Sequence, residues 1–165
     1  LHTVDVMEQN LKIQLQGISQ EHLNHVFADH KMTIGQMAVH AMAWPRYFLS
    51  EQPPWELTKW TCRPCEYPLT LEFVDEVIAD GSQAMRNKLN AIDDSLLEID
   101  EQGRKGAGYI LYRLQVHSIV HAMQIGYLRH LLEPDWKLGG QFGDMANSLI
   151  RMSYHTSPDL KTRGF

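Results

Sequence analysis

Apolar residues recur at the three- and four-residue spacing of α-helices along this 165-residue chain. No segment shows the sustained alternation of a β-strand, so the pattern predicts an all-helical protein. The first repeat covers residues 4–15 and stops before Gly17, a residue that often follows the end of a helix. A short turn of helix or an irregular link is expected next, with Ser19 as its cap. Thr33 is expected to open the second helix, because Gln36 lies three residues later in the capping-box position.

Prolines and polar runs predict where the next helices end and begin. Pro45 is expected to kink the second helix or to end its regular part, because proline removes a backbone donor and crowds the preceding turn. Residues 53–69 read as a long irregular connection that is rich in proline. A third helix is predicted over about 70–92, with Gly81 and Ser82 as a weak point within it.

The fourth predicted helix is the longest, running from about 107 to 132 until Pro134 stops it. A last short helix is predicted at about 143–153, before an irregular tail over about 154–165. No internal repeat or domain boundary is visible, so residues 1–165 are expected to form one domain. The expected fold is a left-handed four-helix bundle with a short additional C-terminal helix. The long connection between the second and third helices permits a crossover as well as a hairpin, so the topology stays open.

The fourth helix carries two histidines one turn apart, His117 and His121, on its predicted core-facing stripe. That stripe consists of Leu114, His117, His121, Ile125, Leu128 and Leu132. Residues four apart in a helix share a face, and His40 lies on the apolar face of the second helix. Three imidazoles can hold a divalent metal ion and leave one position open for water or substrate. The alternative is a polar core network, in which each imidazole finds its own hydrogen-bond partner. The spacing alone leaves both interpretations open.

Composition narrows the classes of function. The net charge of -5 and the isoelectric point near 6.0 argue against a broad nucleic-acid surface, which would usually be basic. No apolar run approaches the roughly 20 residues of a membrane-spanning helix. No secretory signal is visible, and two cysteines are too few for a disulfide scaffold. A cytoplasmic protein that binds neither nucleic acid nor membrane is therefore expected.

Two segments give a resemblance to a known family. They are TIGQMAVHAMAWPRYF and, much later, HSIVHAMQIGYLRHLL. In order and spacing they resemble the DinB/YfiT-like metalloenzyme family, over about residues 4–132. The matching positions are His40, His117, His121, Gln124, Tyr127, Leu128 and Arg129. The resemblance implies a four-helix bundle whose three histidines bind a divalent metal ion, with zinc or nickel favoured over iron or copper.

The same resemblance implies a function and an assembly. Some members act as thiol S-transferases, in which the metal ion activates a low-molecular-weight thiol as its thiolate, and many form homodimers. A metal-dependent hydrolase on the same site is the first alternative, since an open metal site can also ionise water. A non-catalytic metal-binding or dimeric interaction protein is the second. The expected partners are a small-molecule substrate and a second copy of the chain, and no catalytic residue is predicted beyond the metal ligands.

Other polar residues receive weaker predictions. Cys62 and Cys65 form a CxxC pair outside the family pattern and are expected to be two loop thiols, with redox use as the alternative. Solvent exposure is predicted for the histidines that precede the second helix, namely His22, His25 and His30. Arg129 and His130 are expected to favour the helix dipole at the end of the fourth helix.

Overall fold

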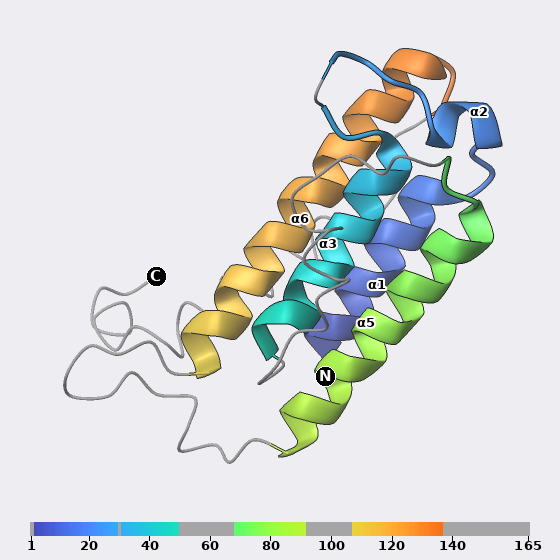
Figure 1. Ribbon diagram of the computed structural model, residues 1–165. Helices are drawn as coiled ribbons and strands as arrows, with labels where there is room; N and C mark the ends of the chain where they lie inside the picture. Colours follow the sequence, from blue (N-terminus) through green and yellow to red (C-terminus); the bar gives the residue numbers. More distant parts are fainter. Residues whose placement is uncertain (1, 30, 50–67, 92–106, 137–165) are drawn as a thin grey trace, which may run out of the picture.

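The computed structural model describes residues 2–29, 31–49, 68–91 and 107–136 (Figure 1). In these ranges every regular element is helical, which confirms the predicted all-α class. The helices are α1 (His2–Leu15), α2 (Gln20–Leu23), α3 (Ile34–Leu49), α5 (Leu71–Ala91) and α6 (Ala107–Leu132). None of these described helices is long and apolar enough to cross a membrane. The predicted C-terminal helix and the tail after it lie outside the described residues.

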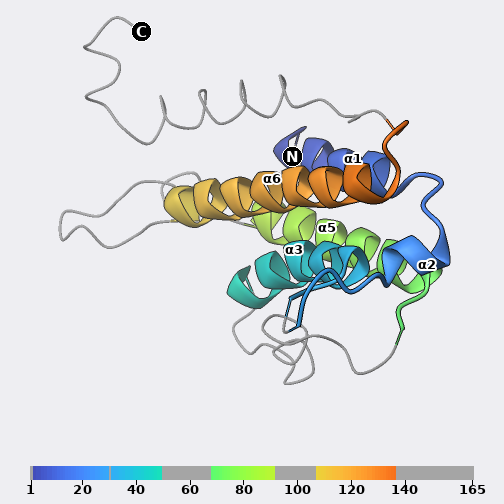
Figure 2. The same ribbon diagram turned by 90° about the horizontal axis from the view of Figure 1, so that it is seen from above.

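The four long helices lie alongside one another, with the short α2 at one end (Figure 1 and Figure 2). Helix α1 packs against α5 and α6, and α3 packs against the same two helices. Figure 1 also shows that α1 and α6 run in one direction, while α3 and α5 run in the other. Since α3 and α5 are parallel neighbours, they are not the two arms of a hairpin. This settles the question that the length of the connection left open.

Local capping contacts confirm three predicted helix boundaries. Thr33 and Gln36 form a reciprocal capping box: Gln36 N donates to Thr33 Oγ1 over 3.2 Å, and Thr33 N donates to Gln36 Oε1 over 2.9 Å. The hydroxyls of Ser19 and Thr70 likewise accept hydrogen bonds from the amides three residues further on. Gly17 follows α1 with a φ of 71°, a left-handed conformation that glycine adopts without strain.

Two positions at which a helix break was predicted lie inside continuous helices. Helix α5 runs unbroken through Gly81 and Ser82, so this pair is not a weak point. Instead, a Cβ atom at Gly81 would lie 2.9 Å from the carbonyl oxygen of Met42. The glycine therefore allows α3 and α5 to approach closely. Helix α3 likewise continues through Pro45, which does not end it.

The apolar core draws on all four long helices. Its fully or almost fully buried members include Met7, Leu11, Leu15, Ile34, Met42, Ile78, Met85 and Ile125. Each large aliphatic side chain of this kind contributes about 1.5–3 kcal/mol when it is buried. This core fixes the distance between helices, and therefore the distance between polar side chains at their contacts.

The buried face of α6 differs from the prediction. It consists of Leu114, Gln115, Ser118, Ala122, Ile125, Gly126 and Arg129. The predicted stripe is thus rotated, and His117 and His121 lie half-buried at the flank of the core rather than at its centre. Small residues such as Ser118 and Ala122 face the core because they let neighbouring helices come close. Large apolar residues also lie on the exposed side of α6, Met123 and Tyr127 among them. Hydrophobic spacing alone therefore did not identify the buried face.

Candidate metal centre

Three histidines from two helices converge where α3 packs against α6. The ring centroid of His40 lies 4.9 Å from that of His117 and 4.9 Å from that of His121. The centroids of His117 and His121 are 4.3 Å apart. One potential ligand atom from each residue lies within 4.8 Å of the other two. Within the described ranges this is the one group of histidine, cysteine or acidic side chains that could hold a metal ion. The structure thus brings together all three predicted ligands.

Neighbouring residues explain why the two helices meet at this point. His117 and His121 share a face because they are one helical turn apart on α6. Ser118, next to His117, donates a long hydrogen bond of 3.4 Å to the carbonyl oxygen of Ala41, next to His40. The contact between Ser118 and Ala41 thus lies directly beside the three histidines, at the point where α3 and α6 pack together.

The environment of the centre favours the neutral form of one imidazole, that of His121. His40 is buried, with 9% of its surface exposed, whereas His117 and His121 are half-buried. Burial lowers the pKa of His121, and its hydrogen bond with Gln124 opposes that lowering without cancelling it. His121 Nδ1 lies 2.8 Å from Gln124 Oε1. A neutral imidazole is the form that can give a lone pair to a metal ion.

The donor set fits a divalent metal ion. Zinc binds imidazole nitrogens at about 2.0–2.1 Å, and a tetrahedral arrangement separates such nitrogens by about 3.3 Å. The candidate atoms lie within 4.8 Å of one another, so small side-chain rotations bring them to ligand spacing. Imidazole suits zinc, nickel, copper and iron alike. The three histidines are therefore close enough to bind one such ion.

A separate surface groove does not include the centre. It lies between α1 and α5, has a volume of about 940 Å³, and is lined by apolar residues such as Ile13 and Leu71 and by acidic residues such as Glu72 and Asp75. None of the three histidines lines it. Its size therefore says nothing about access to the histidines.

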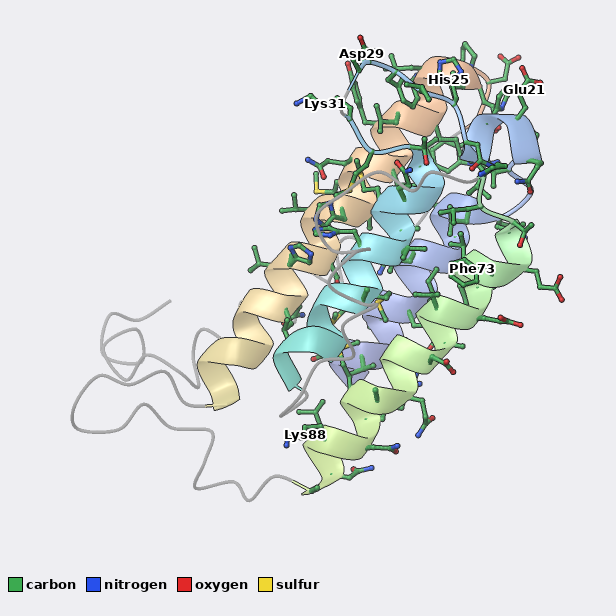
Figure 3. All side chains as sticks on the ribbon, in the orientation of Figure 1. Glu21, His25, Asp29, Lys31, Phe73 and Lys88 are labelled. Atoms are coloured by element: carbon green, nitrogen blue, oxygen red, sulfur yellow. The ribbon has the colours of Figure 1, made fainter. Side chains whose placement is uncertain are left out.

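The histidines before α3 were predicted to be exposed, and the structure confirms this for one of the two that it describes. His25 is exposed and lies at one end of the helices with Glu21 (Figure 3). His22 is half-buried instead, and its Nδ1 lies 2.7 Å from Glu133 Oε1. The spacing analysis missed this contact because the two residues are 111 positions apart in the chain. His30, Cys62 and Cys65 lie outside the described residues.

The sequence also did not predict the burial of Arg129, whose surface is only 3% exposed. Its Nη1 donates to the carbonyl oxygens of Gln14 and Gln16, over 2.7 and 2.9 Å, at the end of α1. Its Nε donates to Glu133 Oε2 over 2.9 Å. We call Arg129, Glu133 and His22 the Arg129 clasp. The one signal in the sequence was the four-residue spacing of Arg129 and Glu133, which is equally typical of surface pairs.

Comparison with known proteins gives no further guide. No family model, no curated protein and no solved structure matches this chain. The assignment of function therefore depends on the residues of the centre and on the resemblance noted in the sequence.

Proposed function

We propose that this protein is a metal-dependent enzyme of the DinB/YfiT-like type, with a four-helix bundle fold and His40, His117 and His121 as its metal ligands. The reaction we propose is thiol S-transfer, with a low-molecular-weight thiol as one substrate. The observation that carries the proposal is the convergence of three imidazoles from two separate helices. Homodimer formation is part of the same proposal and is supported by the resemblance alone.

Each histidine has a distinct part in the proposed centre. His40 is shielded from water, while the half-buried His117 and His121 leave a side that solvent and substrate can reach. Burial lowers the pKa of His121 and so keeps this ligand deprotonated near neutral pH. A bound divalent cation would favour the thiolate form of a coordinated thiol, which is the attacking species. In the transfer, the sulfur bonds to an electrophilic carbon, the leaving group departs with its electron pair, and the thiol proton passes to solvent.

Partial exposure of two ligands supports an enzyme over a purely structural site. Structural zinc sites are usually closed by four protein ligands, whereas catalytic sites keep one position open. The described residues supply three candidate ligands at this point. Hydrolysis by a metal-bound water remains the alternative reaction at the same centre, and an added thiol separates the two.

The first experiment measures the metal content of the purified protein by elemental analysis. We expect about one divalent ion per chain in the wild type and almost none in the double variant His117→Ala/His121→Ala. The control is His130→Ala, because His130 is an exposed histidine on the same helix. A wild-type protein that stays without metal under replete conditions would overturn the proposal.

The second experiment separates the two reactions. Metal-loaded protein is mixed with a model electrophile, such as 1-chloro-2,4-dinitrobenzene, with and without cysteine as the thiol. S-transfer predicts consumption that requires both the thiol and the three histidines. Turnover of an activated ester without any thiol would instead support the hydrolase.

A further inference from the structure

A hydrogen bond beside the centre defines the protonation of one ligand. His121 Nδ1 faces Gln124 Oε1 at 2.8 Å, three residues further along α6. A carbonyl oxygen of an amide accepts hydrogen bonds and cannot donate them, so this contact is a hydrogen bond only in the tautomer that carries the proton on His121 Nδ1. A neutral imidazole has only one N–H group. The lone pair of His121 is therefore on Nε2.

The orientation of the Gln124 amide decides which tautomer of His121 is favoured, because its oxygen and its NH₂ group favour opposite tautomers. If the NH₂ end faced His121, it would donate to Nδ1 and move the ring proton to Nε2. An Nε2 that carries a proton cannot bind a metal ion. The orientation in the structure, with Oε1 of Gln124 facing Nδ1, is the one that leaves Nε2 of His121 available.

We propose that Gln124 is a positioning residue, which holds His121 in the Nδ1–H tautomer and presents Nε2 to the centre shared with His40 and His117. Metal-binding histidines generally donate their second ring N–H to an acceptor in this way, and loss of that acceptor weakens metal binding about 10–100-fold. The consequence for metal binding rests on the proposed function. The tautomer of His121 does not, because it is a property of the protein without metal.

Two substitutions test the role of the Gln124 oxygen. Glutamate at this position has acceptor oxygens and no donor, so Gln124→Glu keeps the contact. Gln124→Leu has a similar length and removes it. The matched control is Gln83→Leu, because Gln83 is also an exposed helical glutamine that bonds a side chain one turn away, Asn87, over 2.8 Å.

The first readout is the imidazole nitrogen spectrum of the metal-free protein, from long-range ¹H–¹⁵N correlation. We expect His121 in the Nδ1–H form in the wild type, Gln124→Glu and Gln83→Leu, and loss of that preference in Gln124→Leu. His130 serves as an internal reference, because its Nδ1 lies 3.1 Å from the carbonyl oxygen of Trp136, a contact that none of the substitutions removes. An Nε2–H form of His121 in the wild type, or an unchanged tautomer in Gln124→Leu, would overturn the inference.

The second readout is the affinity for Zn²⁺, measured by competition with a chromogenic chelator. We expect Gln124→Leu to bind about 10–100-fold more weakly than the wild type, and Gln124→Glu to bind at least as tightly. Equal affinity of the wild type and Gln124→Leu would overturn the inference while the proposed function stands. A wild-type protein that binds no Zn²⁺ would overturn the proposed function, and the nitrogen spectrum would still decide the tautomer.

Discussion

Two polar clusters on α6 are built in opposite ways, although His121 and Arg129 are only about two helical turns apart. In the Arg129 clasp, the guanidinium bonds two backbone carbonyls and Glu133, and Glu133 also contacts His22. Donors there meet acceptors, and positive charge meets negative charge. At the candidate metal centre, by contrast, three side chains of one chemical kind converge on each other. Three bases around one point suit a shared cation.

This difference separates groups that hold the fold from groups that we propose bind a metal ion. The clasp ties the end of α1 to the end of α6 through the hydrogen bonds of Arg129. The centre offers a set of lone pairs that one metal ion can use. We therefore expect damage to the clasp to reduce stability and damage to the centre to reduce metal binding, with little exchange between the two effects.

The largest expected effect comes from breaking the clasp. Arg129→Met leaves Glu133 and two carbonyl groups without their buried donor, which should lower the free energy of unfolding by about 3–5 kcal/mol. Urea denaturation measures this change. The matched control is Arg86→Met. Arg86 also binds carboxylates, those of Asp5 and Glu8, but its side chain is 26% exposed, so its loss should cost only about 1 kcal/mol. Equal losses in the two variants would contradict the buried role of Arg129.

The clasp also shows where sequence reasoning succeeds and where it fails. The bounds of α6 and the capping box at Thr33 were predictable, because helix periodicity and capping depend on residues close in the chain. The buried face of α6 and the contacts of Arg129 depend on α1, more than 100 residues away. No local signal distinguishes a buried arginine from a surface one.

The convergence of the three histidines was predictable for a related reason. The spacing of His117 and His121 fixes their common face whichever side of α6 is buried. The placement of His40 beside them needed the α3–α6 contact, which the pattern made plausible and the resemblance supported. The predicted burial of the pair was too deep, because Ser118 and Ala122 rather than the histidines face the core.

The next largest effect is stabilisation by added metal. With Zn²⁺ at about 100 times its dissociation constant, the free energy of unfolding of the wild type should rise by about 2.7 kcal/mol. The variant His117→Ala/His121→Ala should gain nothing from Zn²⁺, and without metal its stability should differ from the wild type by less than about 1 kcal/mol. Denaturation with and without Zn²⁺ checks both points. A large loss of stability in the metal-free double variant would show that the histidines hold the fold.

A smaller effect on the free energy of unfolding is expected from Glu133, the carboxylate of the clasp. Partial burial alone would raise the pKa of Glu133, but hydrogen bonds from His22 and Arg129 outweigh it and lower the pKa below its usual 4.5. A carboxyl whose pKa is lower in the folded protein stabilises the fold above its unfolded pKa, and this contribution is lost as the pH falls through the folded pKa. At neutral pH, Glu133→Gln should cost about 1–2 kcal/mol.

The pH dependence provides the measurement for Glu133. The difference in unfolding free energy between the wild type and Glu133→Gln should shrink as the pH is lowered from 6 to 3. In an Arg129→Met background, Glu133→Gln should lower the free energy of unfolding by less at every pH, because Glu133 has already lost one of its two partners. A difference that stays constant from pH 6 to pH 3 would contradict the role of the charged carboxylate.

The smallest expected effect comes from the contact that aligns the centre. The Ser118–Ala41 hydrogen bond is long, at 3.4 Å, so Ser118→Ala should lower the free energy of unfolding by only about 0.5 kcal/mol and change Zn²⁺ affinity little. Packing of a small side chain, more than the hydrogen bond, would then set the distance between α3 and α6. Ser118→Leu tests this directly: the added volume should cost about 1–3 kcal/mol and separate His40 from His117 and His121, which weakens Zn²⁺ binding with all three ligands present. Strong Zn²⁺ binding by Ser118→Leu would mean that the helices need not be this close, and that the centre is formed by the metal ion rather than by the fold.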